Sequence, residues 1–175
     1  MSNNIEIKAS VEDAQHLREL IETSCGKPSD ILIQRDIFYR LNNSRLKMRN
    51  VNGHSELIYY SRANTSGPKL SKYLRVPIIF PGIVHFVLKT ILGVRGVVNK
   101  KRVLFFSENT RIHLDEVDKL GAFLELEVVL EQAEDSEAGI AKANQLMSIF
   151  NIKEEDLISR SYIDLLENDI EPHNL

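Results

Sequence analysis

The chain has 175 residues, 43% of them hydrophobic and 27% charged, which suits one globular domain with a sizeable buried core. Its net charge of −3 gives no general attraction to nucleic acid or to an anionic membrane. The one cysteine, Cys25, excludes an internal disulfide and a multi-cysteine metal site, and it suits a reducing compartment. Because the first residues lack a signal peptide and the longest apolar stretch is interrupted by prolines and charges, we expect a cytoplasmic protein.

The N-terminal part is predicted to form a strand followed by a helix. Residues 5–9 alternate polar and apolar side chains, whereas residues 11–23 carry apolar side chains at helical spacing. Ser10 is the expected N-cap of this helix, with Asp13 three residues further on as in a capping box. The tripeptide Gly26-Lys27-Pro28 is expected to end the helix.

Strand-like runs in hairpin order occupy the next part of the chain. They cover residues 31–41, 44–49, 56–62 and 72–78. Asn52-Gly53 is a strong signal for a two-residue hairpin turn, and residues 63–71 are expected to form a loop. Residues 81–92 have helical spacing, with Pro81 in the first turn and Gly93 as the C-cap.

The second half of the chain adds three strands and then more helix. Residues 94–107, 111–115 and 123–128 are the strands, residues 133–150 predict a helix, and residues 154–157 start a short one. Residues 161–166 end a single domain over residues 1–166, and residues 167–175 are expected to be a polar tail. About eight strands, mostly in hairpin order, indicate an antiparallel α+β domain, and eight are enough to close a barrel that holds a ligand.

Charged side chains recur on one face of six predicted strands. The sets that share a face are Glu6 and Lys8; Arg45, Lys47 and Arg49; Glu56 and Arg62; Lys100 and Arg102; Arg111, His113 and Asp115; and Glu125 and Glu127. A solvated outer face explains any single strand, but six such strands favour a charged cavity. Basic residues dominate the middle strands and carboxylates mark the first and last, which suits a polyphosphate bound together with Mg²⁺ or Mn²⁺.

Other kinds of site have less support. The sequence has neither a GxxxxGK[ST] nor a GxGxxG loop, and its five histidines show no HExxH spacing. His113 alone is expected to be an interior hydrogen-bonding group rather than a zinc ligand. The cluster Lys100-Lys101-Arg102 is short and lies in an acidic chain, so it predicts a nucleic-acid site only weakly.

The ordered set of charged motifs resembles the CYTH superfamily of triphosphate tunnel metalloenzymes and looks closest to its class IV adenylate cyclase-like branch. The family's N-terminal ExExK reads Asn4-Ile5-Glu6-Ile7-Lys8 here, so Asn4 replaces the first glutamate. The other segments that carry the resemblance are residues 34–39, 45–49, 56–62, 100–102, 111–115, 125–127 and 161–166. The resemblance implies an α+β fold, an eight-stranded antiparallel closed barrel that forms a tunnel, with helices packed outside.

The resemblance also implies roles for individual residues. The ligands of Mg²⁺ or Mn²⁺ would be Glu6, Glu125, Glu127 and, as a further candidate, Asp115. Phosphate oxygens would be bound by Lys8, Arg45, Lys47, Arg49, Arg62, Lys100, Arg102 and Arg111. Catalysis would rest on Lys8 and Glu6, with Lys8 orienting an attacking water. Because Asn4 offers only a neutral carbonyl oxygen, metal affinity falls or a second metal is lost under this interpretation.

Three functions follow as alternatives. The leading one is metal-dependent hydrolysis of a triphosphate, whether inorganic tripolyphosphate, thiamine triphosphate or a nucleoside triphosphate. A class IV-type adenylate cyclase, suggested by the ending around Tyr162, is the second, and a non-catalytic binder of polyphosphate or phosphorylated ligands, suggested by Asn4, is the third. We expect a small triphosphate-containing molecule as partner, neither nucleic acid nor membrane, and a monomer or a homodimer.

Overall fold

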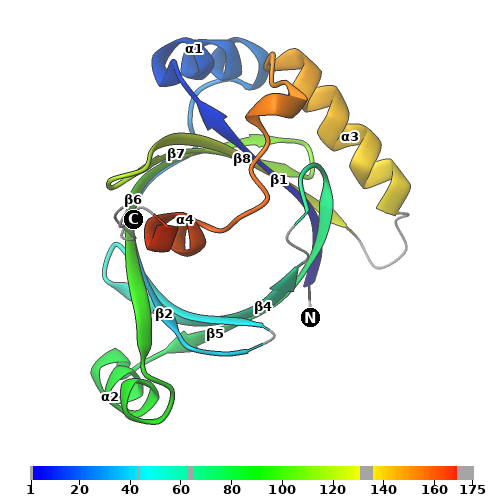
Figure 1. Ribbon diagram of the computed structural model, residues 1–175. Helices are drawn as coiled ribbons and strands as arrows, with labels where there is room; N and C mark the ends of the chain where they lie inside the picture. The colour runs from blue at the N-terminus through cyan, green and yellow to red at the C-terminus, as the bar shows by residue number, and fades with distance from the viewer. Residues whose placement is uncertain (1, 43, 63–64, 131–135, 169–175) are drawn as a thin grey trace, which may run out of the picture.

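The computed structural model describes residues 2–42, 44–62, 65–130 and 136–168, in which eight antiparallel strands close into one barrel (Figure 1). The strands are β1 (Ser2–Val11), β2 (Asp30–Tyr39), β3 (Arg45–Val51), β4 (His54–Arg62), β5 (Lys69–Ile78), β6 (Val94–Ser107), β7 (Thr110–Val117) and β8 (Gly121–Leu130). They hydrogen-bond in the order β1-β5-β4-β3-β2-β6-β7-β8, and β8 pairs with β1 to close the ring. The predicted closed antiparallel barrel is confirmed.

The described part of the chain also contains five helical segments. They are α1 (Ala14–Cys25), α2 (Pro81–Leu92), α3 (Ser136–Ile149), the 3₁₀ turn η1 (Glu154–Asp156) and α4 (Tyr162–Asn168). Among these helices, none combines the length and the apolar character that a membrane span requires. Residues 133–135 of the predicted third helix lie outside the described residues, and α4 extends two residues into the segment predicted to be a tail.

Two predicted boundaries are wrong. Ser10 does not cap α1, because β1 stays paired with β8 as far as the Val11–Ala122 pair. The Oδ1 atom of Asp13 instead accepts the backbone N–H of His16 at 2.9 Å and caps the helix. β5 begins at residue 69, inside the segment predicted as a loop, because its first residues pair with β1.

The hairpin turn at Asn52-Gly53 is confirmed and sets the register of two cavity strands. Both residues have positive φ angles, 49° and 87°, as a two-residue turn of type I′ requires. The tight turn places Arg49 of β3 opposite Glu56 of β4.

The largest apolar core lies outside the ring, where α1 and α3 pack on the barrel (Figure 1). Ile7 of β1 and Leu126 of β8 are fully buried in it, so the residues that alternate with them face the barrel interior. Gly139 lets α3 come close to the sheet, because a Cβ atom there would lie 2.8 Å from the side chains of Ile5 and Leu130. Outer packing therefore fixes which side chains point inward.

Helix α4 differs from the other helices because it lies within the ring of strands when the barrel is viewed end-on (Figure 1). Its Ile163 packs in a cluster with Phe38, Val98 and Phe123. Gly96 of β6 permits this approach, since a Cβ atom there would lie 2.5 Å from Ile163 Cδ1. The prediction of helices outside the barrel holds for α1, α2 and α3, whereas α4 lies within the ring (Figure 1).

Candidate active site

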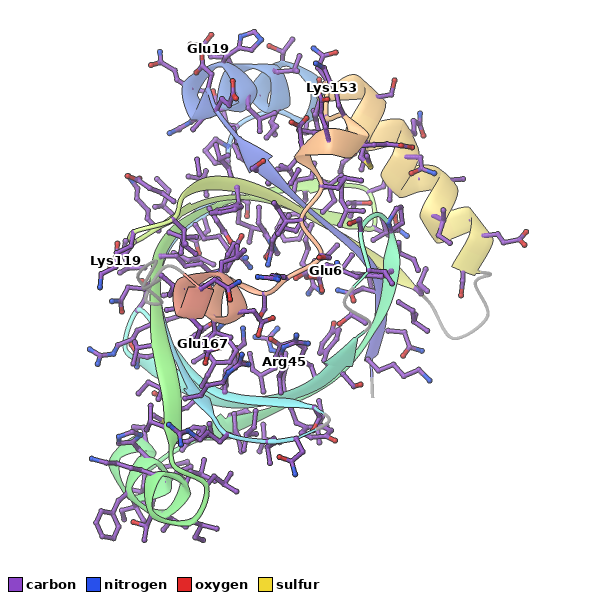
Figure 2. All side chains as sticks on the ribbon, in the orientation of Figure 1. Glu6, Glu19, Arg45, Lys119, Lys153 and Glu167 are labelled. Carbon is purple, nitrogen blue, oxygen red and sulfur yellow. The ribbon has the colours of Figure 1, made fainter. Side chains whose placement is uncertain are left out.

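A cavity of about 600 Å³ runs through the barrel interior, and all eight strands and α4 contribute to its wall (Figure 2). Its charged lining residues are Glu6, Lys8, Asp36, Lys47, Arg49, Glu56, Arg75, Lys100, Arg102, Arg111, Glu125 and Glu127. Most of the charges that alternate along the six predicted strands thus meet in one space instead of facing solvent.

The register of β1, β7 and β8 brings the predicted carboxylates together. Glu127 lies opposite Glu6 on one side and opposite Arg111 on the other. Glu125 in the same way lies between Lys8 and His113. Antiparallel pairing of three adjacent strands therefore produces a compact block of alternating charge.

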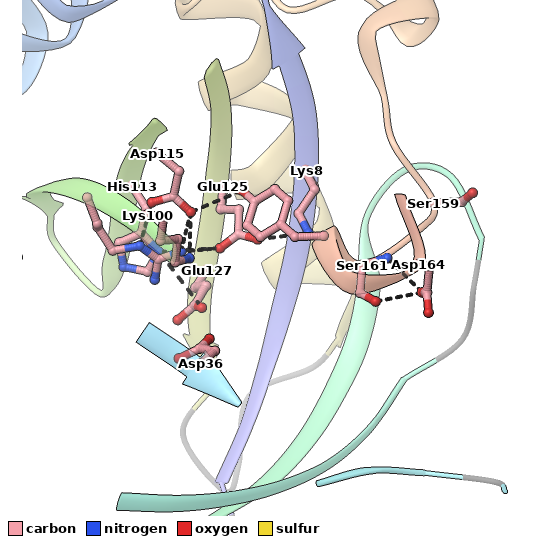
Figure 3. A network of polar contacts seen from close by, with 12 residues as sticks. Lys8, Asp36, Lys100, His113, Asp115, Glu125, Glu127, Ser159, Ser161 and Asp164 are labelled. Carbon is pink, nitrogen blue, oxygen red and sulfur yellow. Dashed lines mark hydrogen bonds and ion pairs between the residues drawn. The ribbon is translucent and has the colours of Figure 1, made fainter. Parts of the chain in front are cut away.

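Glu125 and Glu127 form a cluster with His113 (Figure 3). One ligand atom from each of the three lies within 4.8 Å of the other two, and Glu6 lines the cavity outside this cluster. Oxygen ligands of this kind are those that Mg²⁺ and Mn²⁺ prefer, so the carboxylate pair fits the predicted metal.

Both members of the carboxylate pair have basic partners. Glu125 bonds to Lys8 Nζ at 3.0 Å and to Arg102, and Glu127 pairs with Arg111 at 2.9 Å. Burial alone would raise the pKa of Glu125, but the charges of Lys8 and Lys100 outweigh burial and hold the pKa well below its usual range. Glu125 is therefore ionised at neutral pH.

The predicted interior position of His113 agrees with the structure, in which the side chain is buried. It is buried, yet its Nδ1 atom has no hydrogen-bond partner, because the nearest oxygens of Glu125 and Glu127 are both 3.9 Å away. Burial and the charge of Arg102 lower the pKa of His113, so the imidazole is neutral at pH 7. The Nδ1 atom therefore faces the two carboxylates without a partner at hydrogen-bond distance.

Asp115 lies deeper than the other predicted ligands and is fully buried. Its two oxygens accept bonds from Arg102 Nε at 2.6 Å, Lys100 Nζ at 2.7 Å and the Tyr162 hydroxyl at 3.0 Å. Burial alone would raise its pKa, but Arg102 and Lys100 hold the pKa far below its usual range. Its predicted role as a metal ligand stays a prediction, and the contacts indicate that Asp115 positions two basic side chains.

A second basic group lies on β3. Asp36 of β2, to which the sequence assigned no role, bonds to Lys47 Nζ at 2.7 Å and to Arg49 Nε at 2.8 Å. Burial and the charge of Arg49 lower the pKa of Lys47 to about 8. In the closed strand order β3 and β8 are four steps apart in either direction, so Lys47 and Arg49 line the wall opposite the carboxylate pair.

Helix α4 supplies groups to which the sequence assigned no role in the cavity. The Tyr162 ring lies under Lys8, with Nζ 3.7 Å from the ring centroid, while its hydroxyl donates to Asp115. Asp164 accepts from Arg45 at 3.0 Å and from Arg95 at 2.7 Å. Of the predicted phosphate-binding residues, Arg45 is thus directed to α4, and the side chain of Arg62 lies outside the described residues.

The fold and the cavity define a class of protein that can hold a polyanion and a divalent cation inside a closed barrel. The model of the CYTH domain matches residues 2–162. The chain therefore belongs to the CYTH family of triphosphate tunnel proteins, whose members typically use divalent metals.

Known proteins of similar sequence and structure agree with this assignment. A protein of Methanocaldococcus jannaschii named "putative adenylate cyclase" is 24% identical, over 92% of this chain and 97% of its own length. The PH1012 protein of Pyrococcus horikoshii has a TM-score of 0.82 and 25% identity, covering 93% of this chain and 98% of that one. A Hippeastrum protein described as a "putative adenylyl cyclase" with dominant triphosphatase activity has a TM-score of 0.65 and 14% identity, covering 97% and 96%.

Proposed function

We propose that this protein is a triphosphatase that depends on a divalent metal and hydrolyses its substrate inside the barrel. The observation that carries the proposal is the arrangement of charge across one cavity, with the Glu125–Glu127 pair on β8 and the Lys47–Arg49 pair on the opposite wall. Among the described residues, seven basic and five acidic side chains line this cavity, so a bound metal and the basic groups would balance a triphosphate.

The metal would be held by Glu125 and Glu127, with Glu6 of the neighbouring strand as a further ligand. When bound, Mg²⁺ or Mn²⁺ neutralises charge on phosphate oxygens. Arg111, adjacent to Glu127, would bind oxygens near the metal. Lys47 and Arg49 would hold the other end of the triphosphate, with Lys100 and Arg102 between them.

Hydrolysis requires water to attack the terminal phosphorus in line with the bond to the bridging oxygen. A new P–O bond forms as the bridging bond breaks, and the diphosphate leaves with the electron pair while the water proton passes to solvent. Lys8 would orient this water, since its ammonium group lies between Glu125 and the Tyr162 ring. Basic side chains would stabilise the charge that develops on the leaving diphosphate.

A panel of substrates tests the proposal. Phosphate release is measured with tripolyphosphate, thiamine triphosphate and ATP, each with Mg²⁺ and with Mn²⁺. We expect turnover of at least one substrate, its loss in Glu127→Ala, and its retention in Glu116→Gln, a change on the exposed side of β7. Absence of turnover with every substrate and both metals would rule the activity out.

Adenylate cyclase activity is the second candidate, and two observations favour it. The Methanocaldococcus relative carries that name, and apolar side chains such as Phe38, Tyr60 and Phe106 share the cavity with the charges and could contact a nucleoside. Product analysis separates the two activities: ATP yields cyclic AMP and pyrophosphate with a cyclase, but ADP and phosphate with a hydrolase. Binding without any product, seen as a ligand-induced rise in melting temperature, would support the non-catalytic alternative.

A further inference from the structure

We propose that His113 binds the metal directly through Nδ1, beside Glu125 and Glu127, and that this nitrogen ligand makes the site prefer Mn²⁺ to Mg²⁺. The inference rests on the metal site of the proposed function and extends it by naming the metal. It also replaces the expectation that His113 is only an interior hydrogen-bonding group.

The distances suit coordination better than a hydrogen bond. Nδ1 of His113 lies 3.9 Å from Glu125 Oε2 and 3.9 Å from Glu127 Oε1, which is too far for a hydrogen bond to either. A divalent cation sits about 2.1 Å from each ligand atom, so it can bridge atoms separated by up to about 4.2 Å. One cation between the three side chains needs only small adjustments of their positions.

The burial of the unpartnered nitrogen adds a second argument. His113 is 4% exposed and its Nδ1 atom has no hydrogen-bond partner. A buried polar atom without a partner is costly and rare in folded proteins, and it calls for a ligand that the cavity can supply. The carboxylates on either side make a cation the suitable ligand.

Glu125 can serve the metal without losing its present partners. Its Oε1 atom faces Lys8 and its Oε2 atom faces Arg102, but each carboxylate oxygen has two lone pairs. These bonds hold the carboxylate in place and leave each oxygen with a second lone pair for a ligand. Glu127, with Arg111 as its basic partner, is held in the same way.

The type of ligand determines the preferred metal. Mg²⁺ favours oxygen ligands, whereas imidazole nitrogen suits transition metals, whose affinities rise along the first row from Mn²⁺. A site with one imidazole and two carboxylates should therefore bind Mn²⁺ more tightly than Mg²⁺. Replacing His113 with an oxygen donor should remove much of this preference.

Pulsed electron paramagnetic resonance of the Mn²⁺-loaded protein without substrate tests the inference. We expect echo modulation from a directly bound ¹⁴N nucleus, and its loss in His113→Gln together with at least about a tenfold fall in the ratio of Mn²⁺ to Mg²⁺ affinity. His54→Gln is the matched control, because His54 also lines the cavity but lies outside the cluster; it should retain the nitrogen signal and the affinity ratio.

Protein labelled with ¹⁵N-histidine repeats the test without a substitution, so the inference can be judged even if His113→Gln does not fold. Replacement of the ¹⁴N modulation by a ¹⁵N pattern supports histidine ligation. Bound Mn²⁺ without a nitrogen signal would overturn the role of His113 and leave the proposed function standing. Failure to bind either metal would overturn both, whereas nitrogen-ligated Mn²⁺ without turnover would remove only the enzymatic proposal.

A separate observation concerns the outer surface, where α2 leaves a large apolar face uncovered. Leu88 and Leu92 of α2 pack on the barrel, but Ile83, Phe86 and Ile91 are between 65% and 72% exposed. Apolar exposure of this extent on one helix is unusual for a protein surface and typically marks an interaction site.

The apolar face continues from the helix onto the sheet. Leu57 of β4 packs with the residues under α2 and pairs with Val76 of β5, which is exposed. The next cross-strand pair, Tyr59 and Leu74, is also exposed. Because α2 projects from the barrel (Figure 1), its exposed face and the exposed side chains of β4 and β5 meet at an angle; we call this apolar surface the step.

We infer that a second copy of this chain covers this step, with α2 of each copy packed on β4 and β5 of the other. A twofold-symmetric dimer would bury the apolar face of the helix and that of the sheet in the same interface, because an isologous interface uses the same surface of both copies. Stable complexes bury roughly 800 Å² per partner, which requires several exposed side chains on each copy, as the helix and the sheet provide here. A flat membrane surface would cover only the projecting helix.

Sedimentation analysis of the full chain tests this inference. We expect a dimer at micromolar concentration, a monomer for Phe86→Glu, and a dimer for Ile149→Glu, which changes an exposed apolar residue on α3. A wild-type protein that stays monomeric at about 100 micromolar, or a Phe86→Glu variant that stays dimeric, would overturn the inference. Liposome binding by the monomeric wild type would assign the face to a membrane instead.

Discussion

Asp115 and Glu127 both project into the barrel from neighbouring strands, yet their surroundings differ sharply. Asp115 is inaccessible to solvent, and Lys100, Arg102 and Tyr162 occupy its oxygens. Glu127 lines the open part of the cavity, where its side chain keeps 20% of its exposure and pairs with Arg111. Asp115, whose oxygens are occupied by the protein's own groups, therefore stabilises the barrel wall. Glu127, which is partly accessible, can bind a ligand in the cavity.

The largest effect expected from this comparison is on stability. Asp115→Asn leaves Lys100 and Arg102 buried with their main partner neutralised, and removing one partner of a buried ion pair costs about 3–5 kcal/mol. Thermal unfolding should show a melting temperature lower by about 10 °C. Asp118→Asn, in the exposed turn after β7, is the control and should leave the melting temperature unchanged. Equal stability of both variants would mean that the network around Asp115 is not structural.

Glu127→Gln is expected to lower the activity strongly and the stability only slightly, the reverse of Asp115→Asn. The amide keeps the shape and one carbonyl oxygen but loses the charge that a divalent metal needs, so turnover should fall about 100-fold or more. The melting temperature should change by only a few degrees, because the side chain is partly exposed. Parallel steady-state kinetics and thermal unfolding check both parts. A variant that is unstable yet fully active per folded molecule would reverse the assigned roles.

The wall opposite Glu127 should make substrate binding depend on pH. Burial and Arg49 lower the pKa of Lys47 to about 8, so this ammonium is charged below that pH and loses its charge as pH rises through it. Affinity for tripolyphosphate should therefore fall about tenfold between pH 7 and pH 9. Calorimetric titration across this range measures the fall, and Lys47→Arg should flatten the dependence. An equally steep fall in that variant would assign the titration to another group.

The smallest expected effect concerns the residue that departs from the ExExK motif. Asn4 lines the cavity and is buried, and its Oδ1 atom has no hydrogen-bond partner. Asn4→Glu adds a negative charge two residues from Glu6 on the same face of β1, so Mn²⁺ affinity should rise several-fold. Metal titration monitored by the free Mn²⁺ signal measures the change. An unchanged titration would show that position 4 does not influence the metal.

Much of the fold and of the charged cavity could be predicted because strand periodicity is a local property. Alternation along the chain was enough to place Lys47 with Arg49, and Glu125 with Glu127, on inward faces. The tight turn at Asn52-Gly53 could also be predicted, because the positive φ angles of a type I′ turn favour Asn and Gly.

The partners of the charged groups could not be predicted because they depend on distant strands and on α4. Tyr162 reaches Asp115 across 47 residues of sequence, and no local pattern indicates that α4 enters the barrel. The same holds for His113, whose neighbours are set by the pairing of β7 with β8. The predicted N-cap at Ser10 is wrong for a similar reason, because pairing with β8 extends β1 beyond this residue.

The proposed triphosphatase depends on a divalent metal bound at the Glu125–Glu127 side of the cavity. The most direct measurement is phosphate release from tripolyphosphate by metal-stripped protein during titration with Mn²⁺. We predict no release without metal and a saturable rise as Mn²⁺ is added, with the rise abolished in Glu127→Gln. Release that is independent of metal, or equal in Glu127→Gln and the wild type, would contradict the claim.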